Sequence, residues 1–152
     1  MTKMDLLRLW KMGLGGVLII NGRRHKISEV VKYEEKGEEW LNLVWKQGGM
    51  EFALEVENKK LTLWKEVDDI LPSDSFPISL PEIEYRGEKY KEAEFGTAKA
   101  VSETRTGKKE SMVMWRVLEA KSGHKLAVEG WDDGVYFYYA EGTLPVSTVQ
   151  AI

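Results

Sequence analysis

The chain has 152 residues, of which 43% are hydrophobic and 31% are charged, and its formal net charge is −3 at pH 7. This composition is ordinary for one globular domain, or for two small β lobes with a common core, and argues against a disordered chain. The mildly acidic balance gives no electrostatic footprint for nucleic acid, and the absence of cysteine excludes disulfides and thiolate chemistry. We expect a cytoplasmic protein, because no apolar run approaches the roughly 18 residues that cross a bilayer.

Residues 1–15 predict a short amphipathic helix, from about Thr2 to Met12. Asp5, Arg8 and Lys11 fall on one stripe, and apolar side chains occupy most of the other positions. So short a helix is marginal in water by itself, so we expect it to pack on a β core. Docking to a membrane surface or a partner is the alternative, but the polar stripe has few cations for a lipid anchor.

Residues 16–67 and 82–145 each predict about five short strands joined by glycine-containing turns. Asn21-Gly22 has the sequence of a two-residue hairpin turn. Residues 68–81 hold three of the four prolines and predict a linker, because dense proline cannot sit inside a sheet. Residues 146–152 are expected to form a tail or a loose edge strand.

The second half of the chain restates the first. The hairpin pattern of residues 50–64 reappears at 124–138, and residues 21–26 match 86–91 in kind. We therefore expect a mainly β fold with two pseudo-repeats of antiparallel strands. They should form a sandwich-like or double-barrel unit, with the short N-terminal helix at one end.

The second repeated hairpin carries aromatic residues on both faces. Its Trp131, Tyr136 and Tyr138 share one face by strand alternation. Packing between the two halves would explain this face. The alternative is an exposed aromatic platform that binds a ligand or a protein, and these three residues are the predicted binding site.

Glu55 and Glu129 occupy equivalent positions in the two hairpins. On a solvated outer face they would have no special role. If the halves pack about a pseudo-twofold axis, however, the two carboxylates could approach each other and form an acid/base pair, because close like charges raise one pKa.

Other motifs give no catalytic residue, metal site or cofactor. His25 and His124 lack a second histidine at ligand spacing, and no serine lies in a nucleophile elbow. Asp132-Asp133-Gly134 fits a tight hairpin turn better than a calcium loop.

The sequence resembles a bacterial family catalogued only as a domain of unknown function. The motif L-x-V-E-x-W-x-D-G of that family is nearly intact over residues 126–134, Tyr33 and Trp40 match its strand pair, and its W-L-x-V-E strand has drifted to residues 52–57. Relatives are often encoded near small membrane proteins, envelope-stress proteins and polyamine-synthesis enzymes. The resemblance therefore implies an accessory role in bacterial envelope or stress physiology, and it brings no catalytic residues.

The favoured function is a non-catalytic binding or adaptor module with a protein partner, and a membrane-associated protein is one candidate for that partner. One alternative is a small-ligand-binding barrel or an enzyme that uses Glu55 and Glu129, which an interior cavity would support. The other is an oligomer-forming structural protein. The oligomeric state itself is not predicted.

Overall fold

The computed structural model describes residues 3–58, 60–70, 82–145 and 148–152. It is mainly antiparallel β structure with one short helix, as the sequence predicts. The elements are α1 (Lys3–Lys11), β1 (Val17–Ile20), β2 (Arg23–Lys26), β3 (Glu29–Glu35), β4 (Glu38–Gln47), β5 (Met50–Glu57), β6 (Lys60–Val67), β7 (Glu82–Tyr85), β8 (Glu88–Thr104), β9 (Gly107–Glu119), β10 (Lys125–Trp131), β11 (Gly134–Ala140), β12 (Thr143–Leu144) and β13 (Val149–Ala151). Most of the predicted linker, residues 71–81, lies outside the described residues.

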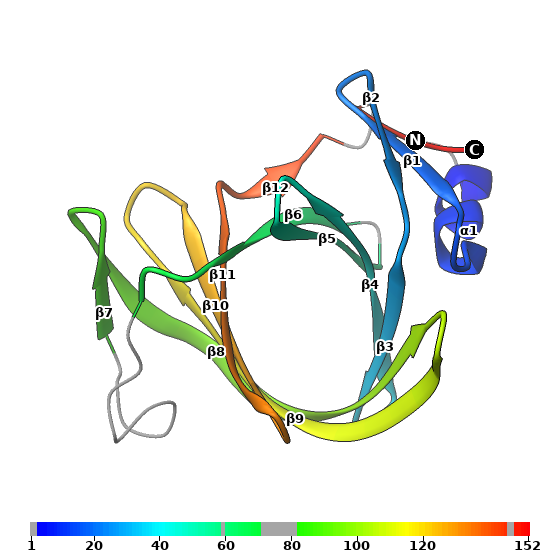
Figure 1. Ribbon diagram of the computed structural model, residues 1–152. Coiled ribbons are helices and arrows are strands. Elements are labelled where there is room, and N and C mark those ends of the chain that lie inside the picture. The colour runs from blue at the N-terminus through cyan, green and yellow to red at the C-terminus, as the bar shows by residue number, and fades with distance from the viewer. Residues whose placement is uncertain (1–2, 59, 71–81, 146–147) are drawn as a thin grey trace.

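Eight of these strands close into one antiparallel barrel (Figure 1). Around the barrel their order is β3, β4, β5, β6, β11, β10, β9 and β8. Pairing of β3 with β8 and of β6 with β11 joins the two halves of the chain. The prediction of a sandwich-like or double-barrel unit is therefore wrong. The outer strands of each half pair with those of the other half and produce a single barrel.

Short turns that need a left-handed backbone connect several of the strands. Asn21 and Gly22 have φ values of 51° and 80°, which confirms the predicted hairpin turn between β1 and β2. Arg86 and Gly87, their counterparts in the second half, have φ values of 48° and 83° between β7 and β8. The similarity of residues 21–26 to 86–91 therefore reflects the same hairpin geometry.

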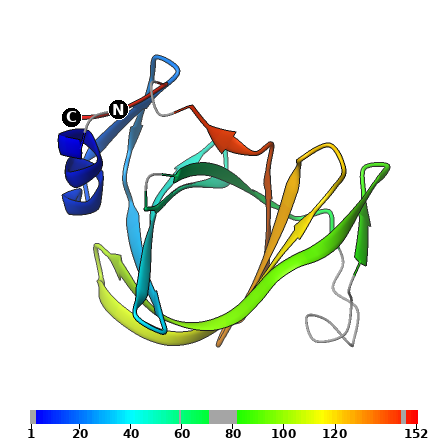
Figure 2. The ribbon, with the colours of Figure 1, turned by 180° about the vertical axis from the view of Figure 1, so that it is seen from behind.

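Two apolar layers cover the outside of the barrel wall on opposite sides (Figures 1 and 2). On one side α1 and the small sheet of β2, β1 and β13 pack against the outer faces of β3–β6, with Leu9, Leu18 and Leu54 almost fully buried. On the other side, Tyr85 of β7 and Tyr90 of β8 pack against Leu118 and the neighbouring strands. Because α1 lies outside the wall, only side chains of the barrel strands occupy the described interior, where they form a third cluster that includes Tyr33, Trp64 and Ala127.

Strand β13 lies within the region predicted as a tail. Its residues pair with β1, with Gln150 opposite Ile19. The C-terminal segment thus completes the small sheet beside α1. Among the described residues, no helix combines the length and the apolar character needed to span a bilayer.

Candidate functional site

The barrel encloses two adjoining cavities, of about 470 Å³ and about 250 Å³, which we call the larger and the smaller chamber. The larger chamber reaches solvent at the exposed Glu38, Lys60 and Glu119, whereas the smaller one reaches it at Lys109 and Asp133 near the other end of the strands. Five residues line both chambers and form a waist between them: Tyr33, Asn42, Ala53, Glu129 and Tyr138.

Aromatic rings run across the interior of the barrel. Tyr33 stacks on Trp40 with ring centroids 5.2 Å apart, and Trp115 meets Trp40 edge-on at 6.0 Å. On its other side, Tyr33 meets Trp131 at 6.4 Å. These four residues come from β3, β4, β9 and β10, so closure of the barrel assembles this aromatic wall.

Glu129 is the centre of a hydrogen-bond network at the waist. Its carboxylate accepts hydrogen bonds from the Tyr33 hydroxyl, at 3.0 and 3.1 Å, and from Trp131 Nε1, at 2.9 Å. Asn42 Nδ2 in turn donates to the Tyr33 hydroxyl at 3.4 Å, while Asn42 Oδ1 is buried and has no hydrogen-bond partner among the described residues. Burial raises the pKa of Glu129, and the bonds from Trp131 and Tyr33 oppose that rise.

Glu55 faces the larger chamber from β5. Its side chain is partly buried and lines the chamber. Burial, followed by the negative charges of Glu57 and Glu129, raises its pKa to about 7, against the opposing effects of Lys60 and a hydrogen bond with Trp64. Near neutral pH, this carboxyl group can therefore both take up and release a proton.

A second carboxyl group with a raised pKa faces the smaller chamber. Burial and the charges of Glu66 and Glu29 raise the pKa of Glu51 to about 7. Each chamber thus contains a glutamate whose pKa is raised toward neutral pH, in addition to Glu129 at the waist.

Negative charge is concentrated along the interior. Among the described residues, eleven acidic residues line the two chambers, whereas four lysines and arginines do. The acidic residues are Glu29, Glu35, Glu38, Glu51, Glu55, Glu57, Glu66, Glu94, Glu119, Glu129 and Asp133. The interior is far more acidic than the nearly balanced chain as a whole.

The residues predicted from the sequence as a binding face all point into the barrel. Trp131, Tyr136 and Tyr138 line the smaller chamber, and Tyr138 also lies at the waist. They do not form an outward platform. Glu55 and Glu129 likewise face the larger chamber together, rather than a solvated outer surface.

Four residues of the chambers were not predicted as site residues from the sequence: Asn42 and the tryptophans Trp40, Trp64 and Trp115. A signal for the lumen is present in β5, where Glu51, Glu55 and Glu57 alternate with apolar residues. Such alternation is also typical of a strand with one face in water. Closure of the barrel, which alternation does not reveal, turns that second face inward.

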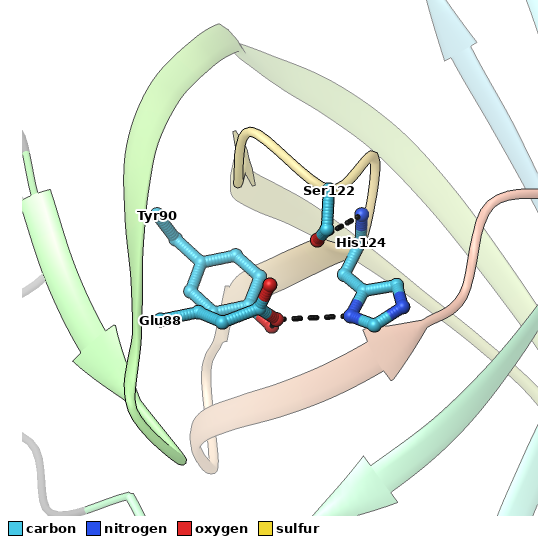
Figure 3. A network of polar contacts seen from close by, with 4 residues as sticks. All are labelled: Glu88, Tyr90, Ser122 and His124. Atoms are coloured by element: carbon cyan, nitrogen blue, oxygen red, sulfur yellow. Dashed lines mark hydrogen bonds and ion pairs between the residues drawn. The ribbon is translucent and has the colours of Figure 1, made fainter.

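A separate polar cluster lies outside the barrel wall (Figure 3). The Glu88 carboxylate accepts hydrogen bonds from His124 Nδ1, at 2.9 Å, from the Tyr90 hydroxyl, at 3.0 Å, and from Ser122. The bonds from Ser122 and His124 hold the pKa of Glu88 below its usual value. The second ring nitrogen of His124 points away from Ser122, so the cluster lacks the serine–histidine bond of a nucleophilic triad. We interpret it as a tie between β8 and the turn before β10.

No curated protein and no solved structure matches this chain. One family model, described as a domain of unknown function (DUF4178), matches residues 13–145. The match includes all eight barrel strands and the residues of both chambers. The expected resemblance is confirmed: the chain belongs to the DUF4178 family.

Proposed function

We propose that this protein binds a small organic ligand inside the barrel. The larger chamber carries the proposal: its volume of about 470 Å³ lies within the range of small-molecule sites. Its aromatic walls supply contact area, and the carboxyl groups of Glu55 and Glu129 supply polar atoms that can orient a ligand. The chamber is the interior cavity that would support the small-ligand-binding alternative.

A neutral, polarity-sensitive dye such as prodan tests the proposal without knowledge of the natural ligand. We expect its emission to increase and shift to the blue when the protein is added. Ala127→Phe fills the larger chamber and should abolish the signal, whereas the matched Met112→Phe, at a side chain with 60% exposure, should preserve it.

Circular dichroism must first show that both variants are folded. Ala53→Leu at the waist is a smaller replacement to use if Ala127→Phe does not fold. An unchanged dye signal in the folded chamber variants, or none in the wild type, would contradict the proposal.

The role of a cytoplasmic adaptor in bacterial envelope or stress physiology stays a separate proposal. Its predicted surface lies in the lumen, so a protein partner would have to contact other residues. A pull-down from bacterial lysate with solubilised membranes tests it. We expect the folded Trp131→Ala/Tyr138→Ala variant to retain such a partner, and loss of the partner would contradict a contact outside the lumen.

An enzyme that uses Glu55 and Glu129 is a second candidate. The pKa of Glu55 near 7 favours it, because a group that titrates at working pH can act as a general acid or base. Consumption of a metabolite by wild-type protein, but not by Glu55→Gln, would support this role.

The oligomer-forming alternative has support on the outside of β8 and β9. Phe95, Met112 and Met114 are 67%, 60% and 45% exposed there. Sedimentation velocity at high protein concentration tests the idea: a strict monomer would exclude it.

We also infer that the two halves arose by duplication. Glu55 pairs with Thr62 in one hairpin, and Glu129 pairs with Tyr136 at the equivalent register of the other. The strand order, in which β3 meets β8 and β6 meets β11, supports a twofold relation between the halves. A family alignment tests the inference: the two halves of many members should align with each other at these positions.

A further inference from the structure

We propose that the lumenal ligand is an organic cation, an amine whose ammonium group lies between Glu55 and Glu129 and whose apolar body packs against the tryptophans of the larger chamber. This inference rests on the proposed function, because it names the chemical class of the ligand in the same cavity.

The first argument is charge. Among the described residues, eleven acidic residues line the two chambers against four basic ones. An anionic ligand would enter an environment of its own sign, whereas a cation would relieve repulsion among the carboxylates. Glu55 and Glu57 are adjacent inward positions of β5, and the charges of Glu57 and Glu129 both act on Glu55.

The second argument is the balance of hydrogen-bond donors and acceptors. Donors inside the barrel already serve its carboxylates: Trp131 and Tyr33 donate to Glu129, and Trp115 Nε1 donates to Glu35 at 2.8 Å. Unused capacity is on the acceptor side, since a carboxylate can accept about four hydrogen bonds and both Glu55 and Glu129 line the chamber. An ammonium group brings three donors and no acceptor, which is the complement that this chamber lacks.

The third argument is the aromatic wall. Trp40, Trp64 and Trp115 line the larger chamber together with Tyr33 and Tyr138. The faces of tryptophan and tyrosine attract cations through their ring quadrupole, most strongly where water is excluded. The same rings give contact area to an apolar body, so an amine that carries an alkyl or aryl group fits this chamber better than a bare hydrated cation.

The raised pKa of Glu55 is consistent with an amine as the ligand. The positive charge of an ammonium beside Glu55 would favour the ionised carboxylate and lower its raised pKa. Binding near pH 7 should therefore release protons from the protein.

Three probes of the same shape but different charge test the inference: 2-phenylethylamine, 2-phenylethanol and phenylacetate. The indole N–H signals of the six tryptophans report the location of binding in NMR spectra of ¹⁵N-labelled protein. Trp40, Trp64 and Trp115 face the larger chamber, whereas Trp10 and Trp45 belong to the packing outside the wall. We expect the amine to shift the first three signals at concentrations at least about tenfold below those that the alcohol or the acid requires.

Glu55→Gln supplies the matched variant, because it preserves the shape of the side chain and removes its charge. We expect it to weaken amine binding by about tenfold and to leave alcohol binding unchanged. Glu39→Gln, on the exposed end of β4, should change neither.

The outcomes separate this inference from the proposed function. Binding of the alcohol or the acid as tightly as the amine would overturn the cation inference but support the lumenal site. Shifts of Trp10 or Trp45 alone would contradict it by placing the amine outside the barrel. If neither the three probes nor prodan affects the lumenal tryptophans, both the proposed function and this inference fail.

Discussion

Tyr33 and Glu129 are 96 positions apart in the chain, yet the Tyr33 hydroxyl donates to both oxygens of the Glu129 carboxylate, at 3.0 and 3.1 Å. This contact joins β3 of the first half to β10 of the second through the middle of the barrel. Tyr33 is 3% exposed, so water cannot readily replace its hydroxyl if it is removed.

Tyr33→Phe should lower the free energy of unfolding by about 1–3 kcal/mol, because a buried carboxylate loses a hydrogen-bond donor. The pKa of Glu129 should rise further, since the bond from Tyr33 opposes its elevation. Urea unfolding measures the first effect, and NMR titration of the Glu129 carboxyl carbon measures the second. Tyr139→Phe, which removes a hydroxyl from the outer wall, serves as control; equal losses in the two variants would contradict the role given to the Tyr33–Glu129 bond.

Glu55 predicts an unusual pH dependence of stability. Its pKa is about 7 in the folded chain and about 4.5 in the unfolded one. Between these values the unfolded state binds fewer protons than the folded state, so the free energy of unfolding should fall as pH rises from about 4.5 to 7. Below about pH 4.5, Glu55 is protonated in both the folded and the unfolded state, so it does not lower the free energy of unfolding there.

Glu55→Gln should remove this part of the pH dependence and stabilise the protein by about 1–3 kcal/mol at pH 8. Thermal or urea unfolding at pH 5 and pH 8 measures the difference, and Glu39→Gln is the exposed control. Stabilisation of equal size at both pH values would show that titration of Glu55 is not its cause.

The N-terminal helix offers a matched pair of leucines. Leu9 is 1% exposed in the layer between α1 and the barrel, whereas Leu7 is 52% exposed on the same helix. Leu9→Ala should cost about 2–5 kcal/mol through the cavity it leaves. Leu7→Ala should cost less than about 0.5 kcal/mol. Similar losses in a denaturant titration would mean that α1 does not pack on the barrel as described.

The Glu88 cluster predicts a local effect on the turn before β10. Glu88→Gln removes the charge that His124, Tyr90 and Ser122 share. Hydrogen exchange at the Gly123 and His124 amides should become faster, while exchange in β3–β6 stays unchanged. Glu84→Gln on β7 is the control. Protection of the turn that survives Glu88→Gln would show that backbone contacts alone hold it, such as the bond from Gly123 N to Ala120 O.

Local patterns in the sequence predicted most individual helices and strands, but they did not predict how the strands close into one barrel. The Asn21-Gly22 turn, the short helix and the alternation in β5 depend on neighbouring residues, so a sequence pattern can reveal them. Pairing of β6 with β11 depends on residues about 70 positions apart, such as Val67 and Phe137, and leaves no periodic signal. A sandwich, two barrels and one barrel are therefore compatible with the same strand patterns.

The residues of the candidate site were likewise predictable where a local pattern revealed them, and not where they depend on long-range pairing. Alternation correctly grouped Trp131 with Tyr136 and Tyr138, but it could not show whether that face points to water or inward. Asn42 escaped notice because one polar residue between the apolar residues of β4 has no distinctive spacing. Its partner Tyr33 lies on β3, diagonally across from it, and their contact exists only once β3 and β4 are paired.

The barrel closes where β3 pairs with β8 and where β6 pairs with β11, and these two pairings differ in length. This closure has a consequence for the assembly of the chain. Five residue pairs join β3 to β8, but only three join β6 to β11. A closed barrel has no edge strand. Four strands from one half alone would leave backbone donors and acceptors unpaired on both edge strands, and these could pair with strands of other chains. We therefore expect residues 1–70 and 82–152, expressed as separate fragments, to aggregate individually and to regain solubility when they are refolded together.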